Sequence, residues 1–269
     1  MKKRHKILPL LGIAALSSCA KSYGQEISDK TQINELQNAI SVRMSRVSCY
    51  QVTTKMLVSS KDAGSEEQNF DIDVTYGTDY SANQYLWMSY KHNKIPVDTY
   101  SLYEVTDKSH GKVIYYEQEN YSDEESYAYA VFPDKENKQT ESGQSEVTFE
   151  SYVPTYAILV LELFYEVRDP LYYAKFIDEN PDPGLNIKYF SKGEGNLTVE
   201  CSRIEMGIGS TYSKHLRMTY SDYLLESAEM ETKSKNDYGS RNEKYELTFA
   251  LTDSSISLPN GWEDKIQEN

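Results

Sequence analysis

The sequence has little of the chemistry that enzymes use at their active sites. Its 269 residues contain three cysteines and four histidines, and none of these has the C-x-x-C or H-E-x-x-H spacing of redox and zinc sites. A G-x-S-x-G elbow, a P-loop and a G-x-G-x-x-G turn are also missing. His92, His110 and His215 fall near turns or on wet strand faces. We therefore predict no catalytic residue, no metal and no cofactor, and a protein that is not an enzyme.

Positive charge is also in short supply. The chain has 28 Lys and Arg against 42 Asp and Glu, and a protein this acidic is repelled by phosphate backbones and anionic headgroups. This balance excludes nucleic-acid binding and disfavours membrane binding of the polybasic type. Hydrophobic residues make up 39% of the chain, which is enough to build a core, so we expect a folded protein rather than a disordered one.

The N-terminus is the one basic segment, and it predicts a signal peptide over residues 1–18. A cluster from Lys2 to Lys6 precedes an apolar run from Ile7 to Ala15, which is shorter than the roughly 20 residues of a membrane-spanning helix. Leu-Ser-Ser-Cys at residues 16–19 resembles the bacterial lipobox, whose cysteine is attached to diacylglycerol. The alternative is an ordinary secretory signal with a chance cysteine. We predict lipid attachment at Cys19 and anchoring on the extracytoplasmic face of a bacterial membrane.

Cys49 and Cys201 form an even pair once Cys19 is assigned to lipid. In an exported protein the two can form a disulfide, which would close a loop of about 150 residues and stabilise the fold by roughly 4 to 5 kcal/mol. The alternative is two separate buried thiols, because a free cysteine behaves as a small apolar residue. The sequence leaves both alternatives open.

The first part of the mature chain is predicted to be a tether followed by a helix. Residues 19–30 are small and polar, which is typical of a short linker. Between residues 31 and 47 the apolar side chains recur at helical spacing, with Asp29 or Thr31 as the N-cap. The residues of this stripe are Ile33, Leu36, Ile40, Met44 and Val47.

From residue 48 the apolar side chains alternate with polar ones, which predicts an antiparallel sheet with one buried face. Phe70, Ile72 and Val74, for example, alternate with Asp71 and Asp73. Turn residues separate about ten such segments. After two strands within residues 48–76, the expected strands cover residues 83–90, 97–107, 112–117, 127–132, 185–190, 196–204, 212–220, 223–233 and 243–252.

A long apolar segment interrupts the strands near the middle of the chain. It predicts a helix near residues 154–177, with Pro154 at the first helical position. Glu162 and Glu166 make this segment too polar for a membrane span, so we expect it to be enclosed. Residues 133–146 are charged and predict an exposed loop. Because no repeat or linker divides residues 31–269, we predict one domain.

This order of elements resembles the LolA and LppX lipoprotein-localisation superfamily. The resemblance covers roughly residues 30–260 and lies in the architecture: a lipobox, an N-terminal helix, about six strands, an apolar helix and about five more strands. It implies an α+β fold, a strongly curved and incompletely closed antiparallel β-barrel with helices covering the concave face. A flat two-sheet sandwich is the alternative fold. Members of the superfamily hold lipid or acyl chains between sheet and helices.

The resemblance implies a cell-envelope protein that binds a lipid or other apolar ligand in the half-barrel. It also extends to transfer of that ligand. The alternative is an interaction protein with a filled barrel and a protein partner. The 24 tyrosines also have two explanations. One is a cleft, including Tyr90, in which tyrosine hydroxyls orient a ligand; the other is the high propensity of tyrosine for β-strands. Candidate lining residues are Phe70, Ile72, Val74, Tyr85, Trp87, Tyr127, Tyr129, Ile158, Leu161 and Phe164.

Overall fold

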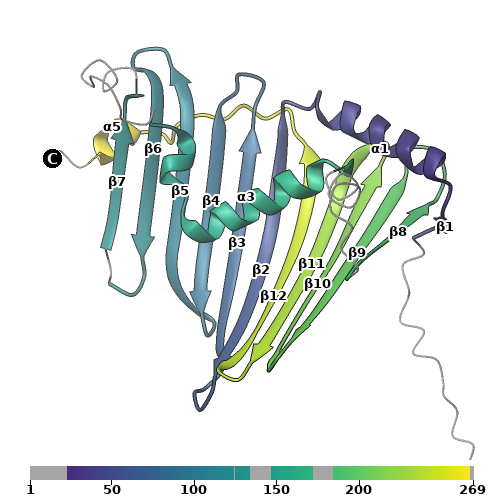
Figure 1. The fold of residues 1–269 in the computed structure, drawn as a ribbon. Helices are drawn as coiled ribbons and strands as arrows, with labels where there is room; N and C mark the ends of the chain where they lie inside the picture. Colours follow the sequence, from purple (N-terminus) through teal and green to yellow (C-terminus); the bar gives the residue numbers. More distant parts are fainter. Residues whose placement is uncertain (1–22, 124, 134–146, 172–183, 267–269) are drawn as a thin grey trace, which may run out of the picture.

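The computed structural model describes residues 23–123, 125–133, 147–171 and 184–266. Twelve antiparallel strands form one sheet that does not close into a barrel (Figure 1). The strands are β1 (Gln25–Ile27), β2 (Tyr50–Asp62), β3 (Gln68–Thr78), β4 (Gln84–His92), β5 (Ile95–Asp107), β6 (Gly111–Asn120), β7 (Glu125–Val131), β8 (Leu185–Ser191), β9 (Leu197–Gly207), β10 (Ser210–Ser221), β11 (Leu224–Asn236) and β12 (Gly239–Leu251). The helices are α1 (Lys30–Met44), η1 (Phe149–Tyr152), α3 (Thr155–Arg168) and α5 (Trp262–Lys265).

The strand order joins two meanders through the pairing of β2 with β12. Strands β2 to β7 follow one another on one side, and β8 to β12 do so on the other, with β1 at the free edge of β8. The last and first long strands pair over their whole length, from Gly239 opposite Asp62 to Leu251 opposite Tyr50. This order confirms the predicted single curved sheet and excludes the two-sheet sandwich.

Helices α1 and α3 lie over the same face of the sheet (Figure 1), which we call the helix face. Asp29 caps α1, since its Oδ1 accepts a hydrogen bond of 2.9 Å from the amide of Thr31. The predicted stripe packs on the sheet through Ile40 and Met44, which are fully buried. Together the two helices and the strands enclose one continuous hydrophobic core.

The opposite side of the sheet, which we call the outer face, is covered at one end. After β12 the chain crosses behind the sheet to α5, beside β6 and β7 (Figure 1). There Trp262 packs with Val113, Tyr115 and Ala128 in a second, smaller cluster. The C-terminal segment therefore covers the β6–β7 end of the outer face.

The structure corrects some of the sequence expectations, and others fall outside the described residues. Gln25–Ile27 pair with β8 and α1 starts at Lys30, so the folded domain begins within the predicted tether. Pro154 is the N-cap of α3, not its first helical residue. Cys19, the signal peptide, residues 134–146 and the expected helical extension over 172–177 lie outside the described residues.

Candidate functional site

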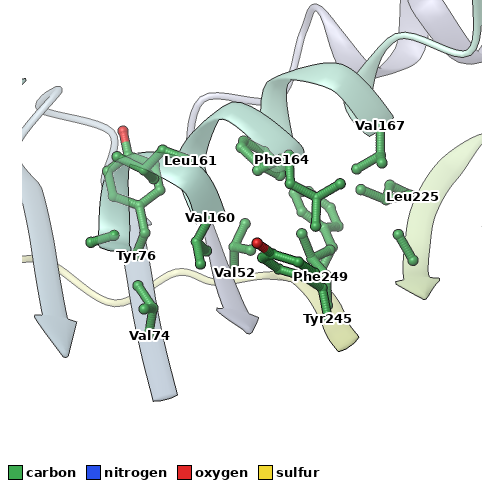
Figure 2. Packing of buried hydrophobic residues seen from close by; sticks show 14 of the residues in the cluster. Val52, Val74, Tyr76, Val160, Leu161, Phe164, Val167, Leu225, Tyr245 and Phe249 are labelled. Carbon is green, nitrogen blue, oxygen red and sulfur yellow. The ribbon is translucent and has the colours of Figure 1, made fainter. Parts of the chain in front are cut away.

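The central helix α3 packs tightly against the helix face. Its buried side chains form one stripe (Figure 2) that contacts β2, β3, β11 and β12. The ring of Phe164 lies 5.3 Å from that of Tyr50 and 6.2 Å from that of Phe249, between ring centroids. The stripe consists of Ala157, Val160, Leu161, Leu163, Phe164 and Val167. Side chains therefore pack the space between α3 and the sheet, which agrees with the filled-barrel alternative for this part of the fold.

The C-terminal end of α3 is fixed by polar contacts from two directions. Tyr220 on β10 donates its hydroxyl proton to the carbonyl of Val167, and burial raises the pKa of Tyr220 well above its usual value. Arg168 Nη2 donates to the carbonyl of Met44 over 3.0 Å. Lys214 Nζ lies 3.2 Å from Glu166 Oε1. These contacts to α1 and β10 hold α3 in place on the sheet.

Away from the centre of its buried stripe, α3 carries large apolar side chains that remain exposed, beside the exposed Glu162. We call Tyr156, Ile158, Leu159 and Tyr165 the outward strip; each is more than a third exposed. A helix that packs on a sheet normally presents polar residues on this side. The outward strip is therefore the unusual apolar surface of the helix face.

A stack of rings leads from the outward strip down the sheet. Tyr156 stacks on Tyr90 at 5.7 Å between centroids, Tyr90 on Phe70 at 6.0 Å, and Phe70 on His92 at 4.8 Å. We call these four rings the aromatic ladder. Burial raises the pKa of the Tyr90 hydroxyl, and the nearby Tyr156 adds to the effect. The ladder joins half-buried aromatic surface on β3 and β4 to α3.

The ten predicted lining residues fall into different places. Ile72, Val74, Leu161 and Phe164 belong to the packed core, and Ile158 is exposed on the outward strip. Phe70 and Tyr129 are partly buried against the same core, and Tyr127 is exposed.

Tyr85 and Trp87 lie on the outer face, so they cannot share a cleft with the others. The reason is the alternation of β4, where Leu86 and Met88 are the residues that point into the core. Tyr85 contacts Tyr103 on the outer face at 4.8 Å between ring centroids. The aromatic content of β4 does not show which of its residues point into the core; the alternation of the strand decides this.

A tyrosine cluster at the β5–β7 end includes residues that the sequence analysis missed. The Tyr116 ring lies 5.8 Å from Tyr100, 5.5 Å from Tyr152 and 5.7 Å from Tyr129. The Tyr100 hydroxyl donates to the carbonyl of Tyr152 over 2.8 Å, and burial raises the pKa of Tyr100. The alternation of β5 and β6 could have placed Tyr100 and Tyr116 on the same face as Leu102. Most of these rings pack on one another, which favours a structural role.

Both described cysteines are free and buried. Cys49 directly precedes β2, and Cys201 lies on β9, with three strands between β9 and β2. With about 4.8 Å between neighbouring strands, the two are too far apart for the roughly 4.4 to 6.8 Å between Cα atoms that a disulfide requires. The structure therefore agrees with the alternative of two separate thiols.

Polar hollows also lie on the described surface. One of about 480 Å³ lies beside β5–β7 and is lined by hydroxyls, Glu117, Glu119 and Lys265. Lys265 Nζ and Glu117 Oε1 are 2.9 Å apart there. Within the described ranges, no group of three or more His, Cys, Asp or Glu is placed to hold a metal ion. None of the helices described in this chain is both long and apolar enough to cross a membrane.

Comparison with known proteins gives a weak likeness in fold. No family model matches the sequence, and no curated protein matches it either. Among solved structures, a DUF1329 family protein from Desulfovibrio piger is similar over 84% of this chain and 95% of that one, with 9% identity and a TM-score of 0.25. An outer membrane lipoprotein-sorting protein domain from Vibrio parahaemolyticus is similar over 86% and 97%, with 8% identity and a TM-score of 0.27. Scores this low carry no argument about function.

Proposed function

We propose that this chain is a lipid-anchored protein of the bacterial cell envelope that binds an apolar or amphipathic ligand without reacting with it. The observation that supports this proposal best is the outward strip of α3. Four large apolar side chains stay exposed on a helix whose other side is fully packed. A ligand that covered them would gain roughly 25 cal/mol for each Å² of apolar surface removed from water.

The proposed ligand lies against the outward strip, not beneath α3, because side chains already fill the space below the helix. The aromatic ladder extends this surface along β3 and β4, where Tyr90 and Phe70 are only partly buried. The hydroxyl of Tyr156 is suited to hydrogen-bond a polar end group of the ligand. An acyl chain with a small polar head matches this combination.

A protein partner is the second candidate for the same surface. The filled space under α3 favours it, since a carrier that encloses its ligand needs a cavity. Exposed Tyr and aliphatic side chains are also typical of the centre of a protein interface. The two candidates make different predictions for lipid content, which the experiment below measures.

The anchoring part of the proposal rests on Cys19 and the preceding Leu-Ser-Ser. In a bacterial host, Cys19→Ser should either release the mature chain from the membrane or leave the precursor uncut. A Cys19→Ser protein that stays membrane-bound and fully processed would refute lipid attachment. This test concerns lipid attachment alone, so a negative result here would leave the ligand-binding proposal standing.

The ligand test uses residues 19–269 with Cys19→Ser, the mature chain without its lipid. Organic extraction and mass spectrometry should find a co-purifying lipid, and a fluorescent fatty acid should bind the delipidated protein. Ile158→Asp with Leu159→Asp should weaken this binding by about tenfold or more, because it places two charges in an apolar contact. Val42→Asp is the matched control, since Val42 is a half-exposed apolar residue on the other helix.

Absence of both lipid and fatty-acid binding, with the protein folded, would contradict the ligand proposal and favour the protein partner. An equal loss of fatty-acid binding in Val42→Asp would also contradict it, because the outward strip would then have no special role. Circular dichroism on each variant separates a loss of binding from a loss of fold.

A further inference from the structure

The hairpins far from α1 carry an exposed apolar patch that no part of the proposed ligand site uses. Ile208 at the tip of β9–β10 is fully exposed, and Met206, Ile204 and Tyr238 are 83%, 60% and 82% exposed. We call these four residues the distal patch. The β9–β10 and β11–β12 tips touch, since a Cβ on Gly209 would lie 3.1 Å from Asp237 Oδ2. Figure 1 shows both tips side by side at the lower end of the sheet.

Strand alternation explains why this patch faces outwards. On β9 the core residue Cys201 and its even-spaced neighbours point to the helix face, so Ile204 and Met206 point to the outer face. The two-residue turn at Ile208 and Gly209, with Gly209 at a φ of +72°, leaves Ile208 without a neighbour to cover it. Apolar residues this exposed and this close together mark an interaction site in most soluble proteins.

Basic side chains surround the patch, although the protein as a whole is acidic. One row of side chains across the outer face contains Met206 on β9, Lys235 on β11 and Lys61 on β2. The next row contains Ile204 on β9 and Lys233 on β11. Lys233 is paired with Glu231 at 2.9 Å, while Lys61 and Lys235 form no ion pair with other described residues. The local charge is therefore suited to an anionic surface.

The same residues line a shallow hollow on this part of the sheet. It measures about 390 Å³, and its lining includes Ile204, Met206, Lys233 and Lys235 together with hydroxyls of Ser213 and Thr211. Ammonium and hydroxyl groups around an apolar floor match the chemistry of a phospholipid headgroup and its first methylene groups. A purely apolar partner would leave Lys61 and Lys235 without a counter-charge among the described residues.

We propose that the distal patch docks on an anionic phospholipid surface, with Ile208, Met206 and Tyr238 entering the interface and the lysines contacting phosphates. The described chain starts on the same face, since the Arg217 guanidinium lies 4.4 Å from the centre of the Tyr23 ring. Cys19 is four residues earlier, within about 14 Å of extended chain. The docking itself does not depend on a ligand at α3.

Vesicle flotation of residues 19–269 with Cys19→Ser tests the proposal. The protein should float with vesicles of phosphatidylcholine mixed with phosphatidylglycerol, and much less with phosphatidylcholine alone. Met206→Asp with Ile208→Asp should lower the partition coefficient by about tenfold or more. Tyr80→Asp is the matched control, because Tyr80 is 76% exposed at a turn of the opposite end.

A second pair of variants tests the lysines. Lys233→Glu with Lys235→Glu should reduce binding to the mixed vesicles by about tenfold, and high salt should do the same. Lys30→Glu with Lys108→Glu makes the same change in net charge elsewhere and should have an effect of less than about threefold. Fatty-acid binding should be normal in the two patch variants and in their two controls, which separates this test from the ligand test.

Three results would overturn the proposal. They are no flotation of the parent protein with either vesicle, equal flotation with both, and equal losses in the patch variants and their controls. If the parent protein fails to float and the Met206→Asp, Ile208→Asp variant loses binding to a protein instead, the patch is a protein interface.

Discussion

The two faces of the sheet differ in which of their strands carry buried apolar side chains and in which elements cover them. The helix face carries a continuous core from β8 to β6, covered by α1 and α3. The outer face has a buried cluster where α5 and Trp262 cover it, near Tyr115 and Ala128. The comparison shows that an apolar residue on this sheet is normally matched by an element that covers it.

The outward strip on α3 and the distal patch on the sheet are two groups of apolar residues that no described element covers. Both contain several large apolar side chains in solvent, one on the helix face and one on the outer face. Because covering apolar surface is the main driving force of folding and association, we expect both groups to be covered in the cell. This expectation underlies the ligand at α3 and the membrane contact at the hairpin tips.

The largest expected effect concerns the core of the helix face. Phe164→Ala should lower the free energy of unfolding by about 3 to 5 kcal/mol, since it removes a fully buried ring between Tyr50 and Phe249. Leu159→Ala, on the exposed side of the same helix, should cost less than about 1 kcal/mol. Urea unfolding of both variants measures the difference. Similar losses in the two would show that α3 is not packed as described.

The outer-face cluster should matter somewhat less. Trp262→Ala should lower the free energy of unfolding by about 2 to 4 kcal/mol, because it exposes the apolar surface of Val113 and Ala128. Lys265→Ala removes an exposed ion pair to Glu117 from the same short helix and should cost less than about 1 kcal/mol. A Trp262→Ala protein as stable as its parent would mean that α5 does not contribute to the fold.

The route of the C-terminal segment to the outer face depends on Asp79. Its carboxylate accepts hydrogen bonds from the amides of Ser81, Asn83 and Ile256 at 2.8 to 3.0 Å, and from the side chain of Asn83. Asp79→Asn should lower the free energy of unfolding by about 1 to 3 kcal/mol at neutral pH, since one of the two carboxylate oxygens becomes an NH2 donor and the donors that it served lose their acceptor. Asp253→Asn, in the same segment but exposed, should have little effect.

The effect of Asp79→Asn should also depend on pH in a defined direction. Burial by itself would raise the pKa of Asp79, but the hydrogen bonds together hold it below its usual value. The carboxylate therefore stabilises the folded state fully above about pH 4, the pKa of an unfolded Asp. That stability is lost as the pH falls through the lower, folded pKa. The difference between Asp79→Asn and its parent should shrink in acid, and a constant difference would contradict the charged role.

Much of the fold could be predicted because strand alternation is a local signal. The phase of β3, with Ile72 and Val74 inwards, came directly from the sequence and is confirmed. β1 was missed because a three-residue edge strand is too short to show alternation, and its pairing with β8 is decided by tertiary contact. The position of α5 beside β7 was also not predictable, since four residues have no recognisable pattern.

The candidate site was harder to predict, because exposure depends on packing between distant elements. The sequence identified α3 as apolar on most of its surface, but it could not tell that Leu161 and Phe164 pack beneath the helix while Ile158 stays exposed. Ile208 and Met206 lie between the expected strands 196–204 and 212–220, and nothing in the sequence marks them as exposed together. Burial has to be known before an apolar residue can be called unusual.

The smallest expected effect is the reactivity of the two thiols, which reports on how firmly the helix face is closed. Burial raises the pKa of Cys201 to about 12, and it raises that of Cys49 as well, with the charge of Asp79 adding to the effect. Because the thiolate is the reactive form, Ellman's reagent should modify neither thiol in native Cys19→Ser protein at pH 8. Both thiols should react after unfolding in denaturant without reductant. No reaction even then would point to a Cys49–Cys201 disulfide, and fast reaction of Cys201 in the native protein would mean that this part of the core opens readily.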